Sequence, residues 1–147
     1  MTAKEYLNRI RFISAGLRVK EQELQQLESD LYAIQSVDTS RERIDGGIPV
    51  SMADKVARIR DMQIVINKEW DQLLDLRKEA RERIMQLEDG RFRAVLTERY
   101  LNNKRWEQIA VDMNYTYRSV IRIHGEALKQ FAVQFKDVLE CPYLDMI

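Results

Sequence analysis

The 147-residue chain has one cysteine, one histidine and two prolines, and it has no run of about 20 apolar residues. Cys141 has no second cysteine to pair with, so an intrachain disulfide is excluded and the composition suits a reducing compartment. The N-terminal residues lack the uninterrupted apolar core of a signal peptide. We therefore expect a cytoplasmic protein without a membrane partner.

The sequence also lacks the motifs on which common enzyme sites are built. It has no Gly-rich phosphate loop, no H-E-x-x-H pair and no serine in a nucleophile elbow. His124 has no Cys or His partner at metal-ligand spacing, and Cys141 has no His base near it in a basic helix. We expect no enzymatic activity, no cofactor and no metal site, and a surface or DNA-backbone position for His124.

Charge balances over the whole chain but not along it. Lysine and arginine total 24, as do aspartate and glutamate, so net charge gives no argument about a nucleic-acid partner. Residues 90–131 hold eight basic and four acidic side chains, whereas residues 1–89 and 132–147 each carry a net charge of −2. Positive charge is concentrated on one segment, as phosphate binding requires, and its modest size favours binding as a dimer or with a partner.

Apolar residues repeat every seven positions over two stretches before residue 89, which predicts two long helices with a coiled-coil seam. Thr2 and Glu5 form a capping box before the first helix, Ser51 and Asp54 a similar signature before the second, and Asp89-Gly90 is expected to end the second. The first seam consists of Ala3, Ile10, Leu17, Leu24 and Leu31 with Tyr6, Ile13, Lys20, Leu27 and Ile34. The second consists of Met52, Ile59, Ile66, Leu73, Ala80 and Leu87 with Met62 and Leu76, widened by Val56, Trp70 and Ile84.

A polar segment at about residues 38–51, with Gly46, Gly47 and Pro49, joins the two helices. Its length lets them fold back as an antiparallel hairpin or reach a second subunit. Lys20 and Glu69 are polar exceptions in the two seams, and symmetric closure about the loop brings them to the same level. We expect them to pair; a buried pair would fix the register without adding much stability.

Residues 96–131 have the pattern of a helix-turn-helix. Ile109, Ala110 and Met113 give its first helix an apolar face, and Ala110 is small where two helices must approach closely. Asn114 tolerates the left-handed backbone of the turn, and Thr116 suits the N-cap of the next helix. The inward residues of that helix are Val120, Ile123, Ala127, Leu128 and Phe131.

The same spacing leaves Tyr117, Arg118, Ser119, Ile121 and Arg122 on the open side of the second motif helix, the part that enters a major groove. Because arginine pairs bidentately with guanine, Arg118 and Arg122 are predicted to read base edges. Tyr117 and Ser119 would assist them at a base edge or a phosphate. Phosphate contacts that set the register are predicted at Lys104, Arg105 and Lys129.

A further helix is expected ahead of the motif, from about Arg91 to Leu101, with Phe92, Val95, Leu96 and Tyr100 inward. Trp106 is expected to pack against Tyr100. The chain thus divides into a helical hairpin at residues 1–89, a helix-turn-helix domain at 90–131 and a tail at 132–147. The tail is expected to fold back on the rest of the chain or to bind a partner.

The motif resembles region 4 of bacterial sigma factors, whose pattern Ile109-Ala110, Thr116, Val120, Ile123 and Ala127-Leu128 match in spacing and type. It departs from that family at Arg105 and Gln108, where a capping box is usual, and at Tyr117 and Ile121, which replace polar residues. The whole chain resembles small phage and prophage helical proteins of Gram-positive bacteria, related to the RinA- and ArpU-like late-gene transcriptional regulators. The resemblance implies an all-α protein in which a long antiparallel coiled-coil hairpin precedes a three-helix, sigma region 4-like head.

We expect a sequence-specific transcriptional regulator that binds double-stranded DNA as a homodimer or higher homo-oligomer, with RNA polymerase as a further candidate partner. Two alternatives stay open. One is a DNA-recognition subunit in packaging, similar in outline to small terminase subunits, for which a ring of many subunits is expected. The other is a protein-interaction module without DNA binding, for which the uncharged Tyr117 and Ile121 leave room.

Overall fold

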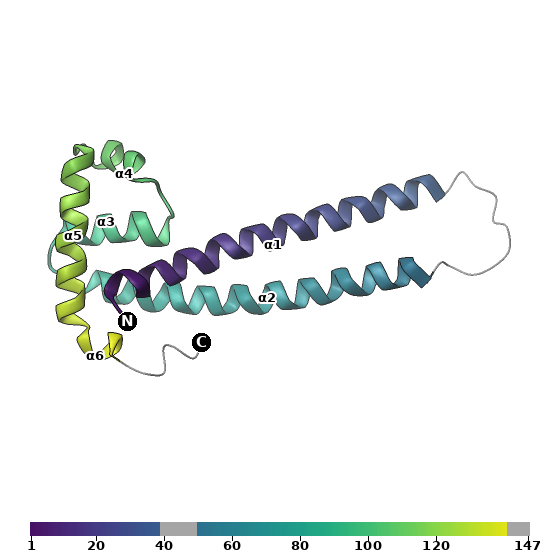
Figure 1. The fold of residues 1–147 in the computed structure, drawn as a ribbon, viewed down its shortest axis with the longest axis horizontal. Helices are drawn as coiled ribbons and strands as arrows, with labels where there is room; N and C mark the ends of the chain where they lie inside the picture. Colours follow the sequence, from purple (N-terminus) through teal and green to yellow (C-terminus); the bar gives the residue numbers. More distant parts are fainter. Residues whose placement is uncertain (39–49, 141–147) are drawn as a thin grey trace. The chain divides into compact units, whose positions relative to one another are not determined.

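The computed structural model describes residues 1–38 and 50–140, and all its regular elements in these ranges are helical (Figure 1). The predicted all-α class is confirmed. The elements are α1 (Ala3–Asp38), α2 (Val50–Met85), α3 (Gly90–Leu96), a π-helical turn η1 (Thr97–Leu101), α4 (Trp106–Met113), α5 (Tyr117–Gln134) and α6 (Lys136–Leu139). Most of the expected linker, and the end of the tail with Cys141, lie outside the described residues.

The start of α1 follows the predicted capping box. The Thr2 amide donates to Glu5 Oε2 over 2.7 Å, and the Glu5 amide donates to Thr2 Oγ1 over 3.2 Å. The bond from the Thr2 amide favours the ionised carboxylate and lowers the pKa of Glu5. The predicted cap of α2 is not at a helix boundary, because α2 begins at Val50 and Ser51 lies inside its first turn.

The end of α2 corrects the prediction at Asp89-Gly90. The helix stops at Met85, and the amides of Gln86 and Leu87 close its last turn on carbonyls three residues earlier. Asp89 instead begins α3, because its side chain accepts a 2.8 Å bond from the Arg91 amide. An aspartate before a glycine suits either a helix end or an N-cap, and Asp89 acts as an N-cap.

The predicted helix from Arg91 to Leu101 is two elements, α3 and the π-helical turn η1. Val95, Leu96 and Tyr100 are buried as expected, whereas Phe92 is half-buried. The η1 turn closes with a bond from the Asn102 amide to the Thr97 carbonyl, and Asn103 follows in the left-handed region with φ of 56°. These two features turn the chain toward α4.

Contacts divide the described chain into two units, one made of residues 15–72 and the other of residues 1–14 together with 73–140. Both long helices therefore contribute to both units. The boundaries expected at 89 and 131 do not coincide with this division. The reason is that apolar residues at the start of α1 and the end of α2, such as Leu7, Ile10 and Ile84, are buried in the unit that holds α3 to α6.

In the unit of residues 15–72, α1 and α2 run antiparallel, as the pairs of contacting side chains show (Figure 1). Lys20 Nζ lies 2.6 Å from Glu69 Oε1, which confirms the expected pairing. The pair is not buried, because the two side chains are 45% and 32% exposed. The Trp70 indole donates to Glu21 over 2.6 Å, and Gln63 donates to Glu28 over 2.9 Å.

Some apolar residues of the seam in this unit are buried and others are exposed. Leu17, Ile59 and Ile66 are buried, each removing apolar area worth about 1.5–3 kcal/mol from water. Leu27 and Val56 are instead 41% and 44% exposed, so the expectation that they would fill the packed face is wrong for this chain alone. The side chain of Ile34 is not among those described.

In the other unit, α5 packs against α3 and α4, and the first turns of α1 also contact it. The rings of Tyr6 and Phe131 stack with centroids 5.9 Å apart, and Phe131 also contacts Phe135. Arg83 of α2 donates to the Tyr6 hydroxyl. The buried residues of α5 are Val120, Ile123, His124, Ala127 and Phe131. These contacts hold α5 along one side and leave its other side open.

Candidate nucleic-acid interface

The connection between α4 and α5 is a three-residue turn whose geometry follows from two side chains. Asn114 adopts the left-handed conformation, with φ of 56° and ψ of 37°, as predicted for this position. The Tyr115 amide then bonds to the Ala110 carbonyl over 3.0 Å, which satisfies a free carbonyl at the end of α4. Thr116 Oγ1 accepts a 3.1 Å bond from the Ser119 amide and caps α5, also as predicted.

A small apolar core joins the two helices. Ile109 and Ala110 of α4 and Val120 of α5 are buried together, with Trp106 and Met113 partly buried against them. The low bulk of Ala110 permits this close approach. Packing of this kind fixes the angle between α4 and α5, so the first turns of α5 project with a defined orientation.

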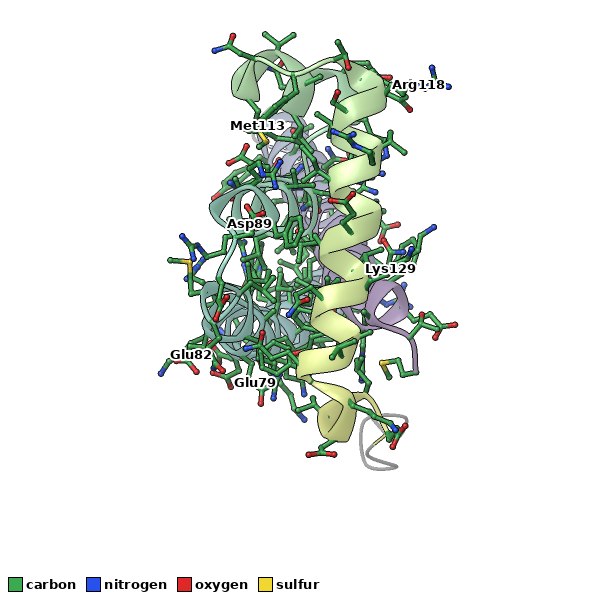
Figure 2. The ribbon with its side chains drawn as sticks, turned by 90° about the vertical axis from the view of Figure 1, so that its left-hand side faces the viewer. Glu79, Glu82, Asp89, Met113, Arg118 and Lys129 are labelled. Atoms are coloured by element: carbon green, nitrogen blue, oxygen red, sulfur yellow. The ribbon has the colours of Figure 1, made fainter. Side chains whose placement is uncertain are left out.

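Three cationic side chains lie on one stripe of the open side of α5. Arg118, Arg122 and Lys129 are exposed, and their spacing of four and seven residues places them within one face of the helix. Figure 2 shows Arg118 and Lys129 on the same side of α5. Eleven residues separate these two, a span of about 17 Å along the axis. None of the three forms an ion pair within the part of the chain that the structure describes.

The other residues predicted for the reading face are placed at the two helix starts. Tyr117 is the first residue of α5 and is half-exposed, while the Ser119 hydroxyl accepts a 2.9 Å bond from Thr116 and supports the cap. Arg105 precedes α4 without capping it and is exposed. Both helix starts therefore present free amide groups and a nearby cation, an arrangement that suits phosphate oxygens.

Lys104 has a different environment from the one expected of a phosphate contact. Its ammonium group lies against Glu98 and 2.9 Å from Asp112 Oδ2, and these bonds raise its pKa. Asp112 also accepts from Gln108 over 2.8 Å, and the bonds from Lys104 and then Gln108 lower its pKa. Lys104 thus ties η1 to α4 with its charge already balanced, which argues against the phosphate role predicted for it.

His124 is buried, with 8% of its surface exposed, so the predicted surface position is wrong. Its Nε2 lies 2.7 Å from the Tyr100 hydroxyl, and the His124 and Trp106 rings meet edge to face with centroids 4.5 Å apart. Trp106 therefore packs against His124, whose ring also contacts Tyr100, the partner expected for Trp106. Burial, together with the charges of Lys4 and Arg99, lowers the pKa of His124 to about 4, and burial raises the pKa of Tyr100 to about 12.

Arg99 is one of the eight basic residues of segment 90–131, and no motif predicts a contact for it. Its guanidinium lies 4.3 Å from the centroid of the Trp106 ring, and Nη1 donates to the Lys104 carbonyl over 3.0 Å. Burial, and then the charge of Arg11, lower its pKa. No sequence motif marks such a residue, because its neighbours come from α1 and from the segment before α4.

Within residues 1–38 and 50–140, no group of three or more His, Cys, Asp or Glu side chains is arranged to hold a metal ion. None of the helices described in these ranges has the length and apolar composition needed to cross a membrane. Comparisons of the chain with models of known protein families, with curated proteins and with solved structures find no match.

Proposed function

We propose that this protein binds double-stranded DNA through α5 as a transcriptional regulator of the phage or prophage type, with α4 and α5 forming a sigma region 4-like helix-turn-helix. One observation carries the proposal. The left-handed turn and cap before α5 direct a stripe of cations, Arg118, Arg122 and Lys129, away from the packed side of the helix.

The position of each cation suggests its task. Arg118 and Arg122 lie in the first two turns of α5, the part of a recognition helix that reaches base edges in a major groove. Tyr117 and Ser119 flank them at the helix start. Lys129 lies farther along the helix and Arg105 at the start of α4, so both fit phosphates on either side of the groove. Lys104 is not part of the proposed contact surface.

The test is fluorescence anisotropy with a duplex selected from a random pool, beside a random duplex, at several salt concentrations. The parent protein should prefer the selected duplex, and log affinity should fall linearly with log salt concentration. In the Arg118→Ala/Arg122→Ala variant the preference should be lost. Each bidentate arginine–guanine contact contributes about 1–3 kcal/mol of discrimination.

A matched control is Lys78→Ala/Arg81→Ala, which removes the same charge from exposed positions of α2. These cations alternate with Asp75, Glu79 and Glu82, and Figure 2 shows Glu79 and Glu82 on the opposite side of α5 from Lys129. The control variant should bind like the parent. Absence of binding by folded parent protein at low salt would exclude DNA recognition by α5.

A protein-interaction module is the second candidate, and exposed apolar side chains near the turn favour it. Val111 is 70% exposed, Tyr117 50% and Ile121 37%, all on α4 or the first turns of α5. A protein partner on this face would bind with little salt dependence, and Val111→Asp would weaken that binding. DNA binding that survives Val111→Asp would favour the first function.

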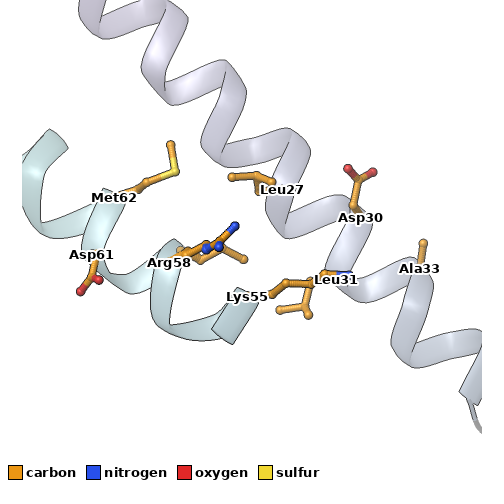
Figure 3. Close-up of a pocket in the computed structure, with 9 residues that line it drawn as sticks. Leu27, Asp30, Leu31, Ala33, Lys55, Arg58, Asp61 and Met62 are labelled. Carbon is orange, nitrogen blue, oxygen red and sulfur yellow. The ribbon is translucent and has the colours of Figure 1, made fainter. Parts of the chain in front are cut away.

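We further propose that the protein is a homodimer joined through residues 15–72. A cavity of about 860 Å³ lies between α1 and α2 in this unit, and its apolar lining includes Leu27, Leu31, Ile59 and Met62. Figure 3 shows Leu27 and Met62 extending toward one another from the two helices. Asp30 and Asp61 line this cavity with Lys55 and Arg58, so the same surface of a second copy can place a cation opposite each carboxylate.

A further inference from the structure

The charges along α1 are sharply separated. Residues 1–20 contain five lysines or arginines and one acidic residue, whereas residues 21–38 contain five acidic residues and no lysine or arginine. Helices in water are stabilised by opposite charges three or four residues apart, and like charges at these spacings destabilise them. Lys4 and Arg11 have no acidic residue at either spacing, so α1 itself supplies neither of them with a partner.

Residues 1–14 of this basic segment belong to the unit that carries α5. The Met1 amino group donates to the Leu139 carbonyl over 3.3 Å, and Tyr6 stacks on Phe131 of α5. At the other end of the segment, the Asn103 side chain donates to Ser14 Oγ over 3.1 Å. The first turns of α1 are thus held at both ends against the elements around the candidate interface.

Lys4 and Arg11 lie seven residues apart on α1, which places them on one face of the helix. Lys4 is exposed and Arg11 half-exposed. Neither forms an ion pair with a carboxylate among the residues that the structure describes. Lys104 of the same unit differs from Lys4 and Arg11, because two carboxylates balance its charge.

The two cations lie close to a third, Arg99. The charge of Arg11 contributes to the lowered pKa of Arg99, and the charges of Lys4 and Arg99 contribute to the lowered pKa of His124. Figure 2 shows the first turns of α1 on the side of α5 to which Lys129 points. Three cations without a described carboxylate partner therefore lie near His124 or Arg99, and two of them belong to the turns of α1 that flank α5.

We propose that Lys4 and Arg11, with Arg99 beside them, form a second phosphate-binding surface, which contacts the backbone of a duplex flanking the bases that α5 reads. The inference rests on the proposed DNA-binding function and extends it. Phosphate groups at regular spacing are the anion that matches a row of separated cations. Because phosphates carry no sequence information, this surface adds affinity and fixes orientation without changing which bases are preferred.

The test is a Lys4→Gln/Arg11→Gln variant, measured by anisotropy with the selected and the random duplex over a range of salt concentrations. Each phosphate contact contributes about 0.9 to the slope of log affinity against log salt concentration, so the slope should become shallower by about 1–2. The ratio of affinities for the two duplexes should stay as in the parent. Hydroxyl-radical footprinting should show lost protection of sugars outside the recognised bases.

Two further variants separate charge from structure. Arg11→Lys keeps the charge and should keep the salt slope of the parent, while Lys78→Gln/Arg81→Gln removes the same charge from α2 and should also keep it. Equal thermal unfolding midpoints of the parent and Lys4→Gln/Arg11→Gln would establish that the fold is retained, and the exposed single variant Lys4→Gln alone should lower the slope by about 1.

An unchanged slope and footprint in Lys4→Gln/Arg11→Gln, with binding still lost in Arg118→Ala/Arg122→Ala, would overturn the second surface and leave the proposed function standing. A change in the preferred bases would also overturn it, since the contact would then not be to phosphate. Parent protein that binds no duplex would remove both proposals together.

Discussion

Among single residues, His124 combines a titratable ring with a position inside the core. It shares a 2.7 Å hydrogen bond with the Tyr100 hydroxyl, and Trp106 covers its ring. Because both partners of the bond are neutral at pH 7, one donates and the other accepts. Protonation of the imidazole places a buried positive charge beside Lys4 and Arg99, which is why the folded state resists it.

We predict that the low pKa of His124 makes the unit of residues 1–14 and 73–140 less stable in acid. Unfolded histidine takes up its proton near pH 6.5, whereas His124 in the folded chain does so near pH 4, so the unfolded state binds more protons between these values. The free energy of unfolding should fall as the pH is lowered from about 6.5 to about 4, with about 2–3 kcal/mol contributed by this group. Denaturant unfolding at a series of pH values measures it.

Carboxylates also titrate in the lower part of this range, so the contribution of His124 is the difference between the parent and a His124→Gln variant. That difference should shrink as the pH falls. The chain has one histidine, so its imidazole signals in an NMR titration are assigned without further work. A midpoint near pH 6.5 in the folded protein would contradict the buried, neutral ring.

Within α5, Gly125 is a helix-interior glycine on the cationic stripe, between Arg122 and Lys129. A Cβ added there meets nothing within 4 Å. We predict that Gly125→Ala raises the free energy of unfolding by about 0.5–1 kcal/mol, because alanine loses less backbone entropy on forming a helix. Duplex affinity should nevertheless fall, since the added methyl group stands where a sugar–phosphate backbone would approach the stripe.

Gly16 of α1 provides the matched control, because a Cβ added there also meets nothing within 4 Å. Gly16→Ala should give a similar gain in unfolding free energy and leave DNA binding unchanged. Thermal or denaturant unfolding gives the first quantity and anisotropy the second. A loss of stability in Gly125→Ala would mean that the helix is packed at that point, contrary to the open face described here.

The local rules of helix ends and turns predicted much of this element. Asn114 and Thr116 were predicted from backbone preference and capping, and both act as expected. The position of His124 was also open to prediction, since it follows Val120 by four residues on the apolar face.

Other features depend on contacts that no sequence spacing reveals. Asp89 reads equally well as a stop or as an N-cap, and only the bend after Met85 decides between them. Lys104 looks like a free cation until folding brings Glu98 and Asp112 to it. Helical spacing therefore predicted which side chains of α5 are exposed, whereas it could not predict the contacts made by α1, η1 and the segment before α4.

For the whole molecule, a single chain leaves the seam of residues 15–72 incomplete. Leu27 and Val56 occupy positions where a coiled-coil seam is packed, yet more than two-fifths of each is exposed. Exposing these apolar side chains to water costs free energy, which polar residues at the same positions would avoid. Covering the cavity beside Leu27 with the same surface of a second copy buries both sets of apolar groups and brings opposite charges together.

We predict that analytical ultracentrifugation gives a molecular mass of twice the 17.5 kDa of one chain. Leu27→Asp/Met62→Asp should reduce the mass to that of one chain without loss of helical circular dichroism, because two carboxylates would enter the apolar lining. The monomeric variant should also bind a selected duplex more weakly, since a dimer offers two copies of α5 to a site with two half-sites.

Ile64→Asp serves as the control, because Ile64 lies on α2 and is 62% exposed but does not line the cavity. It should leave the dimer mass unchanged. A parent protein that stays monomeric at high concentration, or a Leu27→Asp/Met62→Asp variant with the mass of the parent, would exclude dimerisation through this cavity. A mass of many subunits would instead favour the ring expected of a packaging subunit. The cavity would then have to contact a neighbour by a heterologous interface, in which the balanced charges of Asp30, Asp61, Lys55 and Arg58 are no longer required to be self-complementary.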